Sequence, residues 1–133
     1  MGSRYLGYRL QVIGFNKNGL QIHFIWLPDY KSGRATKDYQ GALNDMNLYL
    51  SIPSNNAQDY LFRGKLYAQL NNHSDAILDF NKAIDVDSSY DQAYMYRGIS
   101  KAELNQNDAC SDLLKAKELG LKDTSQYLEK YCH

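Results

Sequence analysis

The chain has 133 residues, with fifteen basic and fifteen acidic side chains, a formal net charge of zero, and 44% hydrophobic residues. This length and composition fit one globular domain. The balanced charge, without a basic cluster, excludes the pattern of proteins that bind DNA or RNA through its phosphates, so no nucleic-acid partner is expected. No apolar run is long enough to span a membrane, so no membrane partner is expected.

The start of the chain and its cysteines bear on location. Arg4, Arg9 and Gln11 interrupt the first fifteen residues, which therefore lack the apolar core and cleavage site of a secretory signal. We expect a cytoplasmic location. Cys110 and Cys132 are too few for a disulfide framework, and Cys110 lies in a helical pattern, so we expect a buried free thiol there.

Residues 1–30 differ from the rest of the chain because apolar and polar residues alternate in two stretches, the pattern of strands. The segment Lys17–Gly19 between them suits a three-residue turn, which would pair Gly14 with Ile22 and Val12 with Phe24. A β-hairpin is the favoured interpretation, and a segment without regular structure is the alternative. The apolar face of such a hairpin predicts packing on the helical part or on another copy of the chain. That face comprises Leu10, Val12, Ile22, Phe24 and Trp26.

Residues 57–90 recur one length later in the chain. A shift of 34 residues places Tyr60, Arg63, Gly64, Ala68 and Leu70 on Tyr94, Arg97, Gly98, Ala102 and Leu104. A period near 34 is typical of stacked helical hairpins. We therefore expect four helices between about 57 and 119, arranged as two antiparallel hairpins. One more helix is expected near 39–50 and another near 124–131.

The same periodicity divides the chain into parts. Residues 1–30 form an N-terminal segment, and residues 31–133 form the helical repeat domain. Within that domain we expect a half repeat at 36–56, repeats at 57–90 and 91–121, and a closing helix at 122–133. The first helix of the earliest repeat is truncated or missing, because residues 26–37 contain Pro28 and Gly33 where it should lie.

Large and small side chains alternate within the unit in the way that paired helices need in order to interlock. The positions are Tyr60, Gly64, Tyr67, Ala76, Phe80 and Ala83. This pattern resembles the tetratricopeptide repeat (TPR), which has an aromatic residue, glycine or alanine at the same places. The chain departs from the family at Arg63, usually leucine, and at Ser88, usually proline. The resemblance implies a mainly α fold, a short solenoid of TPR-like helix-turn-helix units, to which the N-terminal β-hairpin would be added.

Two arginines and two aspartates occupy equivalent places in the repeats. Arg63 and Asp79 in the first correspond to Arg97 and Asp112 in the second. In both repeats the arginine replaces a residue that the family commonly makes apolar. We therefore predict an ion pair in each hairpin, joining its first helix to its second.

The sequence contains no constellation for catalysis. It has no glycine-rich phosphate loop, no histidine pair at metal-ligand spacing, and no nucleophile with an evident base. Asp85, Asp87 and Asp91 lack the loop glycine and the distal glutamate of a calcium site. We therefore expect no catalytic residue, no metal, no cofactor and no enzymatic activity.

The resemblance implies that the first helix of each hairpin lines a concave surface. The partner-binding residues expected on it are Gln58, Leu61, Lys65, Gln92, Met95 and Ile99. We predict a non-catalytic scaffold module that binds a peptide or helix of another polypeptide there. A clamp for a terminal carboxylate is disfavoured because Lys65 is the one cation among them. For Leu61 and Ile99, packing between repeats is the alternative. The alternative function is self-assembly into a homo-oligomer through the repeat or hairpin surface.

Overall fold

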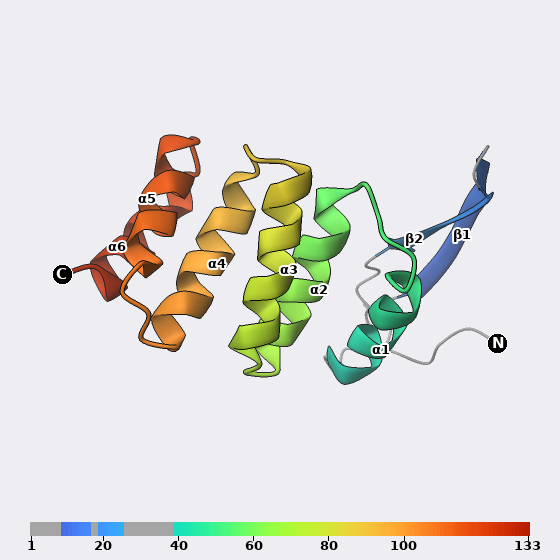
Figure 1. Cartoon of the computed structure of the whole chain (residues 1–133), viewed down its shortest axis with the longest axis horizontal. Helices are drawn as coiled ribbons and strands as arrows, with labels where there is room; N and C mark the ends of the chain where they lie inside the picture. Colours follow the sequence, from blue (N-terminus) through green and yellow to red (C-terminus); the bar gives the residue numbers. More distant parts are fainter. Residues whose placement is uncertain (1–8, 17–18, 26–38) are drawn as a thin grey trace, which may run out of the picture. The chain divides into compact units, whose positions relative to one another are not determined.

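A computed structural model of the chain describes residues 9–16, 19–25 and 39–133. The chain divides into two compact units, Met1–Ser51 and Ile52–His133. In its described residues the first unit contains two strands and one helix, and the second unit contains only helices (Figure 1). The described residues are therefore mainly α, as predicted.

Strands β1 (Arg9–Asn16) and β2 (Gly19–Ile25) pair antiparallel in the first unit. The register predicted from the sequence is wrong, because Val12 lies opposite Ile22 and not opposite Phe24. Pairing of Asn16 with Gly19 shortens the connection by one residue, and an irregularity between Val12 and Gly14 shifts the register by one more. Helix α1 (Tyr39–Tyr49) follows in the same unit. Trp26 and the truncated first helix predicted at 26–37 lie outside the described residues.

The second unit contains the two helical hairpins and a closing helix. The first hairpin is α2 (Ala57–Gln69) with α3 (His73–Val86), and the second is α4 (Asp91–Glu103) with α5 (Ala109–Glu118). A 3-10 turn, η1 (Lys122–Thr124), leads into α6 (Ser125–Tyr131). In Figure 1 these helices follow one another in chain order. The helix ranges predicted from the repeat are confirmed.

Asparagines cap the N-terminal ends of both helices in the first hairpin, and they also form the turn inside each hairpin. The side chain of Asn56 accepts a hydrogen bond from the backbone N–H of Gln58 at 3.0 Å, and Asn72 caps α3 through Asp75 in the same way. Asn71 and Asn105 hold equivalent places in the two intra-repeat turns and adopt φ of 59° and 56°. Asparagine tolerates this left-handed conformation better than most residues, so the turn chemistry of the two repeats matches.

The helices of each hairpin approach most closely at a glycine. A Cβ atom built on Gly64 in α2 would lie 2.5 Å from Cε1 of Phe80 in α3. A Cβ atom on Gly98 in α4 would lie 2.9 Å from Cγ of Leu113 in α5. Phe80 and Leu113 are both fully buried, so neither side chain has free space to move into. Only glycine fits at these two crossings without repacking.

Replacing Gly64 by alanine should lower the free energy of unfolding by about 1–3 kcal/mol. The clash with the Phe80 ring should outweigh the gain in helix propensity, which is roughly 1 kcal/mol for glycine to alanine. Urea denaturation measures the change. The double variant Gly64→Ala/Phe80→Leu is the control, because the smaller side chain removes part of the clash. A Gly64→Ala variant as stable as the wild type would show that the crossing can relax.

Candidate interaction surface

Each hairpin contains the predicted ion pair. Nε and Nη2 of Arg63 each donate to a carboxylate oxygen of Asp79 at 2.7 Å. Nε and Nη2 of Arg97 donate in the same way to Asp112, at 2.8 and 2.6 Å. Both arginines therefore bind their aspartate through two parallel hydrogen bonds, the strongest geometry for this pair. The prediction of one ion pair in each hairpin is confirmed.

These ion pairs are largely removed from water. Asp79 is 2% exposed and Asp112 is 5% exposed. The hydrogen bonds to Asp79 raise the pKa of Arg63 above its usual value, and those to Asp112 do the same for Arg97. Both arginines therefore stay charged at any physiological pH and are committed to the interior of their hairpin.

The second pair belongs to a larger network. Nη1 of Arg97 also donates to the side-chain oxygen of Asn81 in the preceding hairpin, at 2.9 Å. Nζ of Lys101 lies 2.6 Å from a carboxylate oxygen of Asp108 and 3.0 Å from one of Asp112. The hydrogen bond from Lys101 lowers the pKa of Asp108 below its ordinary value. Lys101, like both arginines, is therefore engaged within the protein.

Replacing Arg63 by alanine should cost about 3–5 kcal/mol of unfolding free energy, because it leaves the buried Asp79 carboxylate unpaired. The matched control is Lys115→Ala, which breaks the exposed pair between Lys115 and Glu118 and should cost less than about 1 kcal/mol. Chemical denaturation of both variants gives the comparison. Equal small losses would mean that burial adds nothing to the Arg63 pair.

The residues predicted to bind a partner differ in accessibility. Gln58 in α2 and Gln92 in α4 are exposed, and Lys65 in α2 is half-buried. Leu61 is only 4% exposed and Met95 only 7%. The side chains that the structure leaves accessible are thus mainly the polar members of the predicted set.

Met95 and Ile99 take part in packing inside the second unit. Met95 forms a buried cluster with Leu113 and Ala116 of α5, and Ile99 packs against this cluster. Side chains of α6 also pack against it, and these are Tyr127, Leu128 and Tyr131. Met95 and Ile99 therefore pack inside their own hairpin and together with α6, whereas the alternative noted for Ile99 was packing between repeats.

Tyr96 was not among the predicted residues, although it lies beside one of them. Nζ of Lys65 is 4.9 Å from the centre of the Tyr96 ring, a cation–π contact between α2 and α4. The ring also stacks on Phe80 with its centre 6.0 Å away. Phe62 holds the equivalent position one repeat earlier, so an aromatic residue recurring at a 34-residue spacing was the signal that could have identified it.

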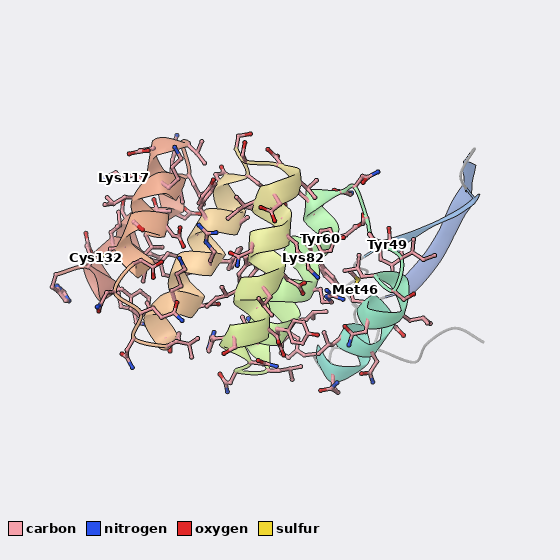
Figure 2. The ribbon with its side chains drawn as sticks, in the orientation of Figure 1. Met46, Tyr49, Tyr60, Lys82, Lys117 and Cys132 are labelled. Carbon is pink, nitrogen blue, oxygen red and sulfur yellow. A yellow bond between two sulfur atoms is a disulfide. The ribbon has the colours of Figure 1, made fainter. Side chains whose placement is uncertain are left out.

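A second lysine also lies over an aromatic ring. Nζ of Lys82 in α3 is 5.8 Å from the centre of the Tyr60 ring in α2, and Figure 2 shows the two side chains beside each other.

Within the described ranges, no three His, Cys, Asp or Glu side chains gather as a metal site would require. None of the helices described has the length and apolar character needed to cross a bilayer.

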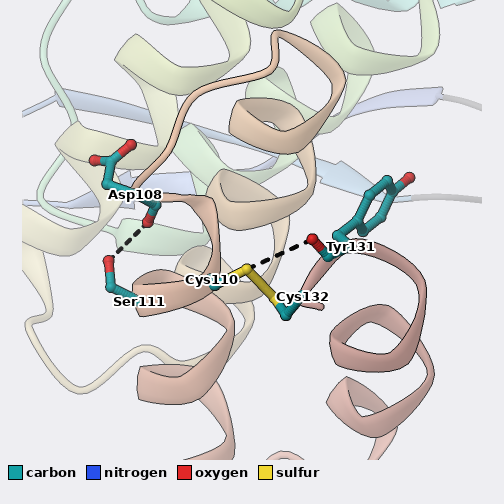
Figure 3. The surroundings of a disulfide bond; sticks show 5 residues. All are labelled: Asp108, Cys110, Ser111, Tyr131 and Cys132. Carbon is teal, nitrogen blue, oxygen red and sulfur yellow. Dashed lines mark hydrogen bonds between the residues drawn. A yellow bond between two sulfur atoms is a disulfide. The ribbon is translucent and has the colours of Figure 1, made fainter.

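The prediction of a free thiol at Cys110 is wrong, because Cys110 and Cys132 form a disulfide (Figure 3). Gly120 follows α5 with φ of 100°, and the chain turns there so that η1 and α6 run back along α5. This return brings the Cα atoms of the two cysteines to 5.7 Å. Spacing along the sequence gave no sign of that proximity, since 22 residues separate them.

Comparison with known proteins identifies the fold. The sequence matches no protein-family model and no curated protein. Among solved structures, the second TPR domain of human RPAP3, in complex with the HSP70 peptide SGPTIEEVD, is 25% identical with a TM-score of 0.67. The match covers 78% of this chain and 86% of that one.

Two further solved domains are similar. The first TPR of Spaghetti (RPAP3), bound to the HSP90 peptide SRMEEVD, is 24% identical with a TM-score of 0.66, over 77% of this chain and 82% of that one. The TPR2B domain of yeast Sti1, in complex with an Hsp70 peptide, is 23% identical with a TM-score of 0.59, over 69% and 76% of the two chains. The helical part of this chain therefore has the TPR fold, and the protein is a TPR-like protein.

Proposed function

We propose that this protein is a non-catalytic interaction module that binds a peptide or helix of another polypeptide across α2 and α4. The observation that carries the proposal is the structural match to TPR domains solved with bound peptides, including one at 25% identity. We define the α2/α4 face by Gln58, Lys65, Gln92 and Tyr96. Gln58 and Lys65 are seven residues apart, so they lie on one side of α2.

The charges of α2 and α4 limit the kind of peptide that this face can hold. The two helices carry four cations, and three of them, Arg63, Arg97 and Lys101, are bound to aspartates. Lys65 instead lies over the Tyr96 ring. Lys65 alone can form one ion pair with a carboxylate of the peptide. A clamp for a terminal carboxylate needs several cations around that group, and this face does not supply them.

The two glutamines offer a different means of recognition. A primary amide both donates and accepts hydrogen bonds, so Gln58 and Gln92 can each bind the backbone of an extended peptide. Such contacts read little of the partner's sequence. The half-buried Tyr96 ring next to Lys65 adds an apolar contact to the face. We propose that Leu61, Met95 and Ile99, also expected to bind the partner, mainly shape this face, because most of their surface is already packed.

Charge reversal at Lys65 should weaken peptide binding at least about tenfold, or roughly 1.4 kcal/mol. Peptides selected from a displayed library on the intact protein serve as probes, and titration calorimetry gives the dissociation constants. Lys117→Glu on α5 is the matched control, because it makes the same charge change on an exposed residue away from the α2/α4 face. An equal loss in both variants would point to general electrostatics and against this face.

The two chaperone peptides test the absence of a carboxylate clamp. SGPTIEEVD and SRMEEVD are the peptides bound by the similar RPAP3 domains. We expect both to bind this protein less than about threefold more tightly than their C-terminally amidated forms, because Lys65 alone faces them. Fluorescence anisotropy with labelled peptides gives the ratio. A loss of more than about thirtyfold on amidation would reveal a clamp and refute this part of the proposal.

Self-assembly through the repeat surface or the strand pair is the competing function. It predicts a stable homo-oligomer whose mass, measured by light scattering, does not change when a selected peptide is added. Our proposal predicts that the peptide binds at one copy per chain and that Lys65→Glu weakens this binding at least about tenfold. Docking of a second copy on strands β1 and β2 belongs to that competing account.

The disulfide also bears on where the protein acts. Disulfides persist in oxidising compartments and are rare in the reducing cytosol. We therefore propose that the form with Cys110 bonded to Cys132 belongs to an oxidising environment. The cytoplasmic location expected from the sequence would apply to the reduced form.

A further inference from the structure

Helix α6 is too small to hold its position unaided. It has seven residues, none of them fully buried, and isolated helices of this length are unstable in water. Its packing on the array comes from the half-buried side chains Tyr127, Leu128 and Tyr131. The hydroxyl of Tyr131 also donates to a carboxylate oxygen of Glu103 at the end of α4.

Both ends of α6 are tied down. Thr124, directly before the helix, is fully buried, and its hydroxyl donates to the carbonyl oxygen of Leu121 at 2.8 Å. Directly after the helix, Cys132 is bonded to Cys110 in the first turn of α5, and Sγ of Cys110 lies 3.7 Å from the carbonyl oxygen of Tyr131 (Figure 3). The disulfide is therefore the covalent tie at the far end of an otherwise weakly packed helix.

The cluster on which α6 packs includes Met95, which the sequence predicted to bind a partner. Met95, Leu113 and Ala116 form the buried cluster, and Tyr96 and Ile99 pack against it together with the side chains of α6. Removing α6 would uncover part of this cluster. The cluster adjoins the α2/α4 face through Tyr96.

We propose that the Cys110–Cys132 disulfide is a redox latch. When it is closed, α6 packs on the cluster of Met95, Leu113 and Ala116. When a dithiol reduces it, α6 detaches beyond Thr124 and this cluster becomes exposed. The regulatory meaning of the latch rests on the proposed function, whereas its opening does not.

The chemistry is thiol–disulfide exchange with a dithiol reductant. One thiolate of the dithiol attacks a sulfur of the pair and forms a mixed disulfide, and its second thiolate then displaces the protein sulfur. Cys110 and Cys132 gain two electrons and two protons and become thiols, and the dithiol becomes a disulfide. Both cysteines are only half-buried, so a reductant can reach them.

Hydrogen exchange followed by mass spectrometry tests the latch on the full chain with and without dithiothreitol. Releasing a loop closed over 22 residues should lower the protection of the α6 amides on the order of a hundredfold. The amides of α2 and α3 should keep their protection. Unchanged exchange in α6 overturns the proposal, and so does equal loss of protection in every helix, because the disulfide would then stabilise the whole unit.

Two variants separate the disulfide from the other ties. Cys110→Ser/Cys132→Ser should reproduce the reduced pattern without reductant and should increase the fluorescence of anilinonaphthalene sulfonate, a dye that binds newly exposed apolar surface. Tyr131→Phe removes only the hydrogen bond to Glu103 and should change α6 exchange less than about tenfold. If Tyr131→Phe opens α6 as fully as the serine variant does, the hydrogen bond is the latch and the proposal is overturned.

The readouts also separate this inference from the proposed function. Exchange and dye binding need no partner, so they report the latch even if no peptide binds. If the latch does not exist, peptides bind the oxidised and reduced proteins equally. If the proposed function is wrong, α6 still opens on reduction but Lys65→Glu has no effect on any selected peptide.

Discussion

Each hairpin depends on the close approach of its two helices at a glycine. Gly64 faces Phe80 and Gly98 faces Leu113 at distances that exclude a further carbon atom. The residue before each glycine is the arginine, and the residue before Phe80 or Leu113 is the aspartate. The contact that seats a large side chain against glycine therefore also sets arginine opposite aspartate. Packing and ion pairing at each crossing come from the same four positions.

This arrangement explains why so much of the helical part could be predicted from the sequence. Each position of the repeat occurs twice in the sequence. The arginine and the aspartate stand at equivalent places in both repeats, as Arg63 with Asp79 and as Arg97 with Asp112, and this recurrence supported the prediction of an ion pair in each. The helix ranges followed from the same repetition. Local information of this kind is sufficient where each helix contacts its neighbour in the chain.

The features that could not be predicted depend on how the chain returns on itself. The disulfide forms because the turn at Gly120 brings Cys132 back to Cys110. The presence of two cysteines in the sequence does not indicate that the chain returns in this way. The register of β1 and β2 depended on an irregularity near Val12 that the alternating pattern does not encode.

On the candidate surface, Gln58 and Gln92 are exposed as expected. Burial of Met95 follows from its contacts with α5 and α6, which spacing within α4 does not reveal.

The fold and the proposed function compete for the same residues. Arginines and lysines on α2 and α4 could have formed a cationic binding surface, but most of them stabilise hairpins through buried aspartates. Lys65 differs because its neighbour is a ring and not a carboxylate. A π face holds the ammonium group in place without neutralising it, so the charge remains available to a ligand.

The hydrogen bond from Arg97 to Asn81 has a consequence for cooperativity. Arg97 bonds within its own hairpin through Asp112 and to the preceding hairpin through Asn81. In the one-dimensional description of repeat proteins, such a contact belongs to the nearest-neighbour coupling and not to the intrinsic stability of either repeat. When α4 and α5 separate, Arg97 loses its orientation and Asn81 loses its partner at the same time. The guanidinium group thus couples the two repeats, which favours their folding and unfolding as one unit.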